Sequence, residues 1–178
     1  AGKISENDID VKALKNSEII FLEGYLWDEG DPKKAFDKAI SNANKVAMSL
    51  SDKFCVDRHK SHFLDLVKNR LDIIFSNEEE IMSLIDTNNF DEVIQFAKEN
   101  KKLFIITRGP KGALSINNGK VIEVQVKKNL NIIDLTGAGD LFAAGYLHGY
   151  LNQFSEEDCL KSGTEMASKI IQQIGARL

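Results

Sequence analysis

A segment of small and acidic residues near the C-terminus has the residue types and spacing needed to handle a phosphate group. Residues 134–140 read Asp-Leu-Thr-Gly-Ala-Gly-Asp and lie where an amphipathic helix is expected to begin. Gly137, Ala138 and Gly139 allow close approach of an anion, toward which the unpaired amides of a first helical turn point. Asp140 lies in the same turn, where its carboxylate can accept the proton of an attacking alcohol. The segment therefore predicts phosphoryl transfer to a hydroxyl group.

The same segment also has a simpler interpretation. A tight glycine turn can be followed by an acidic residue that only stabilises the helix dipole, and Asp140 fits that description as well. The pattern G-x-G-D does not decide between the two when it is taken alone.

Two further segments carry polar residues directly after expected strands. Residues 77–80 read Asn-Glu-Glu-Glu, so Asn77 can cap a helix with three glutamates in its first turn. Carboxylates are also the hard oxygen ligands that magnesium prefers, often through water. Residues 107–112 read Thr-Arg-Gly-Pro-Lys-Gly, which suits either a nucleotide-contacting loop or a plain β-turn. Arg108 has a guanidinium suited to phosphates, but its place in the pattern carries little weight.

The run DLTGAGDLFAAGY resembles the C-terminal signature of the ribokinase-like (PfkB) carbohydrate kinases. The resemblance implies that Asp140 is the catalytic base. It also implies that Gly137, Ala138 and Gly139 form the anion hole for the transferred phosphoryl group. The resemblance continues from near residue 17 to the last residue and is strongest to the adenosine kinase and ribokinase branches.

The other two segments match motifs of the same family in the expected order. Asn77 and Glu80 fit N-x-x-E, which implies that they organise magnesium, water and the ATP phosphates, with Glu80 acting on magnesium through water. Thr107, Gly109 and Gly112 fit T-x-G-x-x-G, which implies contacts to the nucleotide. The implied cofactors are therefore ATP and magnesium.

Five more positions gain a functional meaning from the resemblance. Thr164 and Ala167 lie on a helix whose family counterpart lines the adenine pocket, although they suit helix packing equally well. Asp134 and Thr136 lie where some family members hold a monovalent cation, which leaves potassium open as a further cofactor. Glu23 matches a place where ribokinase-like enzymes contact the acceptor sugar, and a glutamate buried at a strand end needs a partner.

Alternating strand and helix patterns are expected to position these groups. Short apolar runs predict strands, and apolar residues at helical spacing predict helices between them. The expected strands are 17–24, 46–51, 71–76, 102–109 and a hairpin over 113–126 turning at Asn118-Gly119; the expected helices are 31–44 (capped by Asp31 before Pro32), 59–69, 78–85, 90–99, 138–152 and 155–174. This alternation predicts an α/β fold: a mainly parallel sheet covered by helices on both faces, in the three-layer, Rossmann-type arrangement of ribokinase-like proteins.

Right-handed crossovers place the carboxyl ends of parallel strands on one edge of the sheet, where ligands bind. Loops 23–30, 76–80 and 107–112, and the turn before Gly137, are expected at that edge. No linker rich in Pro, Gly or Ser divides the chain. Residues 1–178 are therefore interpreted as a single domain, the C-terminal nucleotide-binding and catalytic portion of a ribokinase-like kinase.

Composition argues against several classes of partner. The 178 residues carry a formal net charge of -4 with scattered lysines, so no nucleic acid partner is expected. No apolar run approaches the ~20 residues that span a membrane. Cys55 and Cys159 lie far apart and are interpreted as reduced thiols of a cytoplasmic protein. His59 and His62 share a helical spacing but lack further ligands, which favours a solvated helix face over a metal site.

The resemblance does not extend to the N-terminal part of the family. There a glycine-rich strand region and a small β lid supply most contacts to the acceptor, and nothing before Ser17 is similar to either. The sequence is therefore expected to begin within a longer domain, with much of the acceptor positioning lost. This leaves open whether the isolated chain is active and whether a homodimer forms through the absent lid region.

The leading expectation is an ATP-dependent kinase that phosphorylates a primary hydroxyl of a small-molecule sugar or nucleoside. A P-loop kinase is disfavoured because no GxxxxGK[ST] is present. A Rossmann-type dinucleotide binder would need G-x-G-x-x-G after the first strand, where the sequence reads EGYLWDEG. The alternative from another class is a non-catalytic nucleotide-binding or oligomeric scaffold on the same fold. The presence of Asp140 argues against that alternative.

Overall fold

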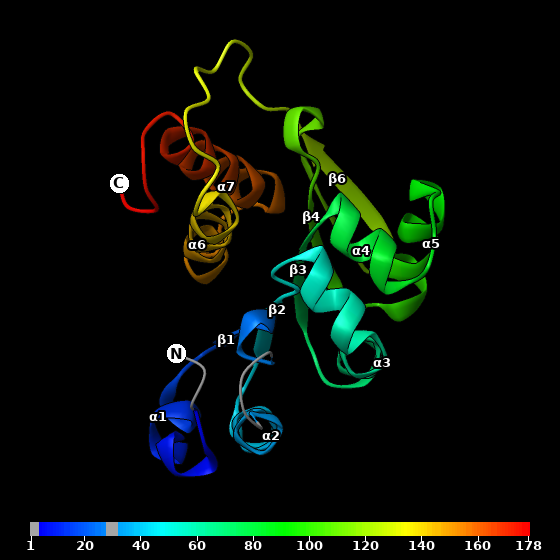
Figure 1. The fold of residues 1–178 in the computed structure, drawn as a ribbon, viewed down its shortest axis with the longest axis vertical. Coiled ribbons are helices and arrows are strands. Elements are labelled where there is room, and N and C mark those ends of the chain that lie inside the picture. The colour runs from blue at the N-terminus through cyan, green and yellow to red at the C-terminus, as the bar shows by residue number, and fades with distance from the viewer. Residues whose placement is uncertain (1–3, 28–31) are drawn as a thin grey trace.

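A computed structural model describes residues 4–27 and 32–178 (Figure 1). Its centre is a six-stranded sheet in which each strand lies beside the one that precedes it along the chain. The strands are β1 (Ile20–Glu23), β2 (Val46–Ser49), β3 (Ile73–Asn77), β4 (Leu103–Thr107), β5 (Ala113–Asn117) and β6 (Lys120–Val124). Strands β1 to β4 are parallel, whereas β5 and β6 are antiparallel to their neighbours. The mainly parallel sheet is therefore confirmed.

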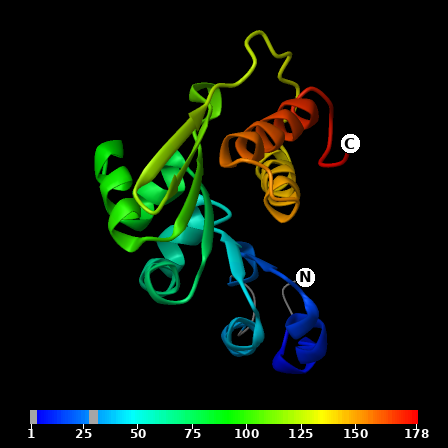
Figure 2. The same cartoon turned by 180° about the vertical axis from the view of Figure 1, so that it is seen from behind.

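Helices cover both faces of this sheet (Figures 1 and 2). The helices are α1 (Val11–Asn16), α2 (Lys33–Asn42), α3 (Lys53–Asn69), α4 (Glu78–Leu84), α5 (Phe90–Asn100), α6 (Ala138–Leu151) and α7 (Glu156–Ile170). Because consecutive parallel strands are joined by crossovers of one hand, α2 to α5 lie on the same face. The pair α6 and α7 covers the opposite face. The predicted three-layer α/β arrangement is thus confirmed.

The alternation of side chains along the strands divides the core into two halves. Ile74 of β3 packs on one face with Phe63 of α3 and Ile81 of α4. Its neighbour Phe75 packs on the other face, where its ring lies 5.7 Å from that of Tyr146 in α6. These strand residues are apolar on both faces, which is the pattern of a sheet buried between two helical layers.

The hairpin predicted at Asn118-Gly119 is confirmed between β5 and β6. Both turn residues have positive φ angles, +47° at Asn118 and +82° at Gly119. Such angles match the right-handed twist of the paired strands and favour this dipeptide in two-residue turns. The antiparallel pairing of β5 with β6 is therefore explained by local turn chemistry.

Helix boundaries differ from the sequence prediction at several ends, among them α7, which was expected over 155–174 and ends at Ile170. The helix expected from residue 59 begins at Lys53, because the carboxylate of Asp52 caps it by accepting a hydrogen bond from Cys55 N at 2.6 Å. The short helix α1 was not predicted, and it too begins after a capping aspartate, Asp10. The predicted capping residue Asp31 lies outside the described residues, and α2 begins at Lys33 after Pro32.

The predicted solvated face with two histidines is wrong for His62. Its imidazole is half-buried, and its Nδ1 accepts a hydrogen bond from the indole of Trp27 at 3.0 Å. Burial lowers the pKa of His62, with the nearby Lys33 ammonium as the next contribution.

Within residues 4–27 and 32–178, no helix combines the length and apolarity that a membrane span requires.

Candidate active site

The start of α6 carries the glycine-rich segment on a left-handed turn. Gly137 is the residue before the helix and has φ of +78°. A Cβ there would lie only 2.9 Å from the Cβ of Ala176, so the turn requires glycine for its conformation and for its contact with the chain end. The turn is also held by Asp134, whose Oδ1 accepts from Thr136 N at 2.9 Å and whose Oδ2 accepts from Gly175 N at 3.0 Å.

Two amides of this first turn already have partners within the chain. Ala138 N donates to Leu135 O at 3.2 Å, and Leu141 N donates to Gly137 O at 2.9 Å. The amides of Gly139 and Asp140 lie between them, at positions where an α-helix supplies no acceptor of its own. A Cβ at Gly139 would meet no atom within 4 Å, so space is open beside this turn. The turn can therefore receive an anion at the positive end of the helix dipole.

The phenol of Tyr25 is influenced by carboxylates from different parts of the chain. Burial raises the pKa of Tyr25, and the carboxylates of Asp52, Glu80 and Asp140 raise it further. These groups come from the loop after β2, the start of α4 and the start of α6. Asp140 itself is exposed.

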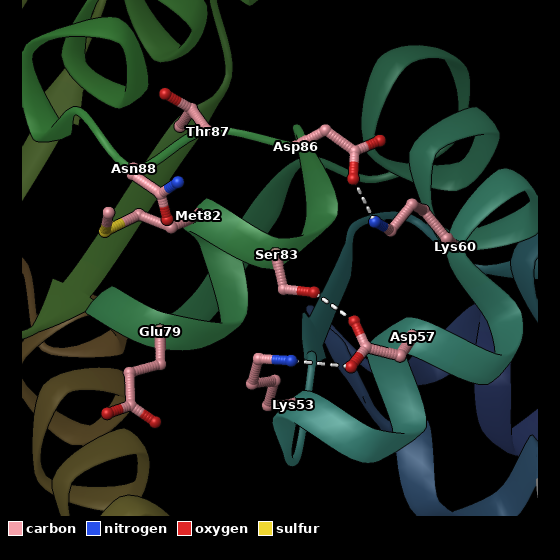
Figure 3. A pocket seen from close by; sticks show the side chains of 9 residues that line it. All are labelled: Lys53, Asp57, Lys60, Glu79, Met82, Ser83, Asp86, Thr87 and Asn88. Atoms are coloured by element: carbon pink, nitrogen blue, oxygen red, sulfur yellow. Dashed lines mark hydrogen bonds and ion pairs between the residues drawn. The ribbon is translucent and has the colours of Figure 1, made fainter.

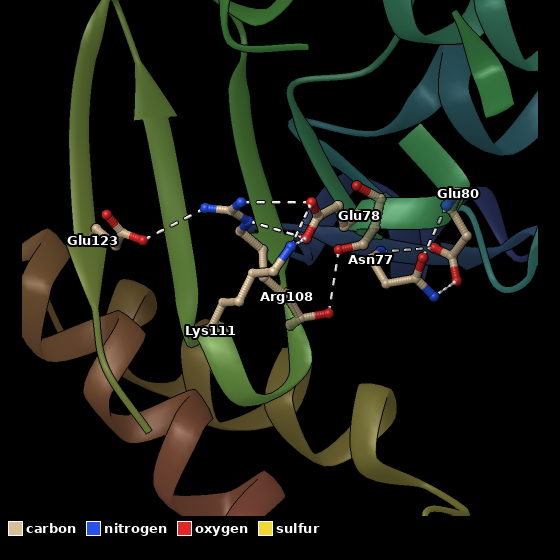
Figure 4. Close-up of polar contacts among 8 residues, drawn as sticks. Asn77, Glu78, Glu80, Arg108, Lys111 and Glu123 are labelled. Carbon is tan, nitrogen blue, oxygen red and sulfur yellow. Dashed lines mark hydrogen bonds and ion pairs between the residues drawn. The ribbon is translucent and has the colours of Figure 1, made fainter. Parts of the chain in front are cut away.

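Asn77 and Glu80 form a reciprocal cap at the start of α4 (Figure 4). Glu80 N donates to Asn77 Oδ1 at 2.8 Å. Both oxygens of the Glu80 carboxylate are used in return, since they accept from Asn77 Nδ2 at 2.6 Å and from Asn77 N at 3.0 Å. The helix-capping interpretation of this segment is therefore realised in the structure.

Glu80 is unusual for an acidic residue because it is only 5% exposed. Burial raises its pKa to about 7, against the opposing effect of the hydrogen bonds from Asn77, while Asp52 and Glu79 raise it further. Carboxylate oxygens and water are the hard ligands that magnesium prefers, so Glu80 has the chemistry to act on magnesium through water. Among the described residues, no three His, Cys, Asp or Glu side chains gather closely enough to hold an ion by themselves.

The loop after β4 folds into a tight turn over residues 107–112. Arg108 N donates to Gly112 O at 2.8 Å, and Gly112 N donates to Gly109 O at 3.1 Å. Gly112 has φ of +97°, and a Cβ there would lie 2.0 Å from Val124 O. Thr107 is paired with Asn77 across the adjacent ends of β4 and β3. The two sequence motifs thus meet at the same edge of the sheet, as predicted.

A charged network that the sequence did not reveal joins these two motifs (Figure 4). Arg108 Nε lies 3.2 Å from Glu78 Oε2, and its NH1 lies 3.6 Å from Glu123 Oε1. Lys111 Nζ lies 3.2 Å from the other oxygen of Glu78. The guanidinium carbon of Arg108 lies 3.9 Å from the centre of the Phe90 ring. In the sequence, the signal for the Arg108–Glu78 pair is limited to a carboxylate directly after Asn77 and a cation directly after Thr107.

The remaining predicted positions lie on β1, on α7 and in the segment before α6. Glu23 ends β1, where it is half-buried and paired in register with Ser49. Thr164 is 9% exposed on α7, and its hydroxyl finds no hydrogen-bond partner among the described residues. Ala167 packs against the core beneath α6 and α7. Backbone hydrogen bonds from Gly175 and Thr136 lower the pKa of Asp134.

A cleft of about 620 Å³ lies elsewhere, between α3 and α4 (Figure 3). Its walls carry ion pairs between Lys53 and Asp57 and between Lys60 and Asp86. None of the residues predicted for the site lines it. The candidate site is therefore not this cleft but the open start of α6 together with the turns after β3 and β4.

Comparisons with known proteins agree with this geometry. A nucleoside kinase of Methanocaldococcus jannaschii is 30% identical over 165 residues, which cover 91% of this chain and 51% of that protein. An adenosine kinase of Dictyostelium discoideum is 30% identical over 186 residues, covering 94% of this chain and 54% of that protein. A crystal structure of adenosine kinase from Sinorhizobium meliloti is 35% identical with a TM-score of 0.95, and covers 99% of this chain and 55% of that one.

The chain spans about half the length of these relatives. A model of the pfkB family carbohydrate kinases matches residues 2–178. Sequence, fold and the order of the motifs agree with this match. The chain belongs to the pfkB family of carbohydrate kinases.

Proposed function

We propose that this chain is the nucleotide-binding and catalytic domain of an ATP-dependent kinase that phosphorylates a primary hydroxyl of a sugar or nucleoside. The observation that carries the proposal is the start of α6, where Asp140 lies in the first turn and open space lies beside Gly139. A base, an acidic partner for a cation and a set of backbone amides are the parts that phosphoryl transfer needs. Relatives named nucleoside kinase and adenosine kinase support this class of acceptor.

In the proposed reaction Asp140 accepts the proton of the acceptor hydroxyl. The oxygen then forms a bond to the γ-phosphorus of ATP, while the bond from that phosphorus to the β,γ-bridging oxygen breaks and ADP leaves. Amides at the start of α6, in the segment Gly137 to Gly139 and at Asp140, would stabilise the charge on the moving group. Ala138 N donates to Leu135 O in this structure, so the amides of Gly139 and Asp140 carry most of this role.

The nucleotide would lie along the edge formed by the ends of β3 and β4. Thr107, Gly109 and Gly112 would contact it there, and Thr164 and Ala167 would face its base. Glu80, oriented by its hydrogen bonds with Asn77, would hold magnesium through water, and the ion would neutralise phosphate charge. Glu23 is proposed to contact the acceptor, and Asp134 with Thr136 to support a potassium site.

The test is Asp140→Asn in the full-length gene product, assayed with ATP, magnesium and a panel of sugars and nucleosides. Asp158→Asn is the matched control, because Asp158 occupies the third position of α7 as Asp140 does in α6. Loss of the base is expected to lower kcat by about 100-fold or more, whereas the control keeps its rate. An equal rate for Asp140→Asn and wild type would remove the base assignment. Nucleotide binding without turnover of any acceptor would favour a non-catalytic scaffold.

A further inference from the structure

Arg108 connects four elements at the edge where the nucleotide is proposed to bind. It follows β4 and contacts Glu78 at the start of α4, Glu123 on β6 and the ring of Phe90 at the start of α5. Its side chain is only 18% exposed, so these contacts are partly shielded from water. The paired contact with Glu78 and the ring contact with Phe90 hold this side chain in one orientation.

The contact with Glu78 links the two motif-bearing turns directly. Glu78 lies next to Asn77 in the capping turn, and Arg108 lies next to Thr107 in the following loop. Asn77 and Thr107 are themselves register partners at the ends of β3 and β4. Backbone pairing ends there, so beyond this point the spacing of the two turns depends on side chains. The Glu78–Arg108 pair bridges that gap.

Charge and shape favour arginine at this position. Burial alone would raise the pKa of Glu78, but hydrogen bonds from Arg108 and Lys111 outweigh it and lower that pKa, so the carboxylate stays ionised. Arg108 offers a planar fork to Glu78 and lays the same plane over Phe90. Lysine cannot do both, because its charge is compact and carries no flat face. Lys111 is 61% exposed, and exposed ion pairs contribute little.

We propose that Arg108 is a positioning residue for the nucleotide: by holding Glu78, it fixes the start of α4 against the loop that follows β4. The proposal rests on the proposed function, since it assumes that both turns face the same ATP. Arg108 itself need not touch the substrate. It acts on nucleotide affinity and leaves acceptor affinity unchanged, because the acceptor is proposed to bind at the end of β1 and the start of α6.

The experiment measures binding of magnesium and a non-hydrolysable ATP analogue by calorimetry, together with KM for ATP and for the acceptor, in the full-length gene product. Arg108→Met and Glu78→Gln each remove the bridge from one side. Arg108→Lys keeps the charge without the fork. Glu123→Gln is the control, because it loses only the longer contact at 3.6 Å with a carboxylate that is 47% exposed.

Arg108→Met and Glu78→Gln are each expected to weaken analogue binding about tenfold, as a displaced positioning group does. The double variant should add little to either single change, because both break the same link. Arg108→Lys should recover part of the loss, and Glu123→Gln should bind as wild type does. The KM for the acceptor should stay constant throughout.

Two results would overturn the inference while leaving the proposed function intact. One is unchanged analogue binding in Arg108→Met and Glu78→Gln. The other is a parallel rise of KM for ATP and acceptor, which would indicate a general structural role. If Arg108→Met does not fold, Arg108→Lys and Glu78→Gln still decide the matter. Failure of the wild-type protein to bind the analogue would instead refute the proposed function, and the inference with it.

Discussion

Asn77 and Glu80 satisfy each other's polar groups at the start of α4, through three hydrogen bonds of 2.6 to 3.0 Å. The same pair is proposed to face magnesium and the ATP phosphates. The cap explains how a buried glutamate is tolerated, because both of its carboxylate oxygens accept hydrogen bonds. A capping role and a binding role are therefore compatible here, and they can be measured separately.

Glu80 should make stability depend on pH. Its pKa is about 7 in the folded chain against a reference of 4.5, so the folded state holds the extra proton between these values. The free energy of unfolding should therefore fall as pH rises from 4.5 to 7, by an amount on the order of 1 to 3 kcal/mol. Urea unfolding of wild type and Glu80→Gln across this range would show the effect as a difference between their curves of unfolding free energy against pH. Parallel curves would contradict the prediction, and Glu79→Gln serves as the exposed control.

Loss of the cap at Asn77 should affect both stability and binding. Asn77→Ala is expected to cost about 2 to 3 kcal/mol of unfolding free energy, because it removes both an N-cap and the Nδ2 donor of buried Glu80. Asn89 caps α5 by accepting from Asp91 N at 3.0 Å, so Asn89→Ala should cost only about 1 kcal/mol. Only Asn77→Ala should weaken calorimetric binding of the magnesium–nucleotide complex. Equal binding by both variants would reduce Asn77 to a cap alone.

Two glycines with positive φ should differ sharply in their tolerance of alanine. A Cβ at Gly112 would lie 2.0 Å from Val124 O, whereas one at Gly119 would meet no atom within 4 Å. Gly112→Ala should therefore destabilise the chain by about 3 kcal/mol or more, through backbone strain and overlap together. Gly119→Ala should cost about 1 to 2 kcal/mol, from the left-handed conformation alone. Thermal unfolding of the two variants side by side tests this, and similar losses would refute it.

The unpartnered hydroxyl of Thr164 should contribute to binding rather than to stability. Thr164→Val keeps the shape and removes a buried oxygen without a hydrogen-bond partner, so the chain should become more stable, by about 1 kcal/mol. If Thr164 faces the adenine base, affinity for ATP should fall at the same time. Ser115→Ala removes another such buried hydroxyl and should leave ATP affinity unchanged. A loss of stability in Thr164→Val would argue for a packing role.

Much of the fold could be predicted because local signals agreed with the final packing. The buried run of β3, the turn at Asn118-Gly119 and the strand–helix alternation each specify their element without distant contacts. Helix α1 escaped prediction because its six residues are too short to show a helical period. The early start of α3 depends on one capping carboxylate, Asp52, whose geometry appears only in three dimensions.

The motifs of the candidate site can be recognised in the sequence, but their surroundings cannot. Spacing marks the glycine-rich segment and the two turns, the resemblance assigns their roles, and the structure brings the two turns together. The burial of Glu80 and the ion pair of Arg108 with Glu78 were not predicted. Arg108 contacts Glu78 across about 30 positions of the chain, and Glu80 is buried by the packing of a whole layer. No local sequence pattern contains this information.

The hydrogen bond from Gly175 to Asp134 spans 41 positions of the chain. Ile133 N likewise donates to Ile171 O, and Ala176 lies against Gly137. The turn that is proposed to bind a phosphate is thus held in place by residues that follow α7 in the chain. During synthesis on the ribosome this turn would therefore acquire its final shape among the last parts of the described chain, once the terminal helix has emerged and docked.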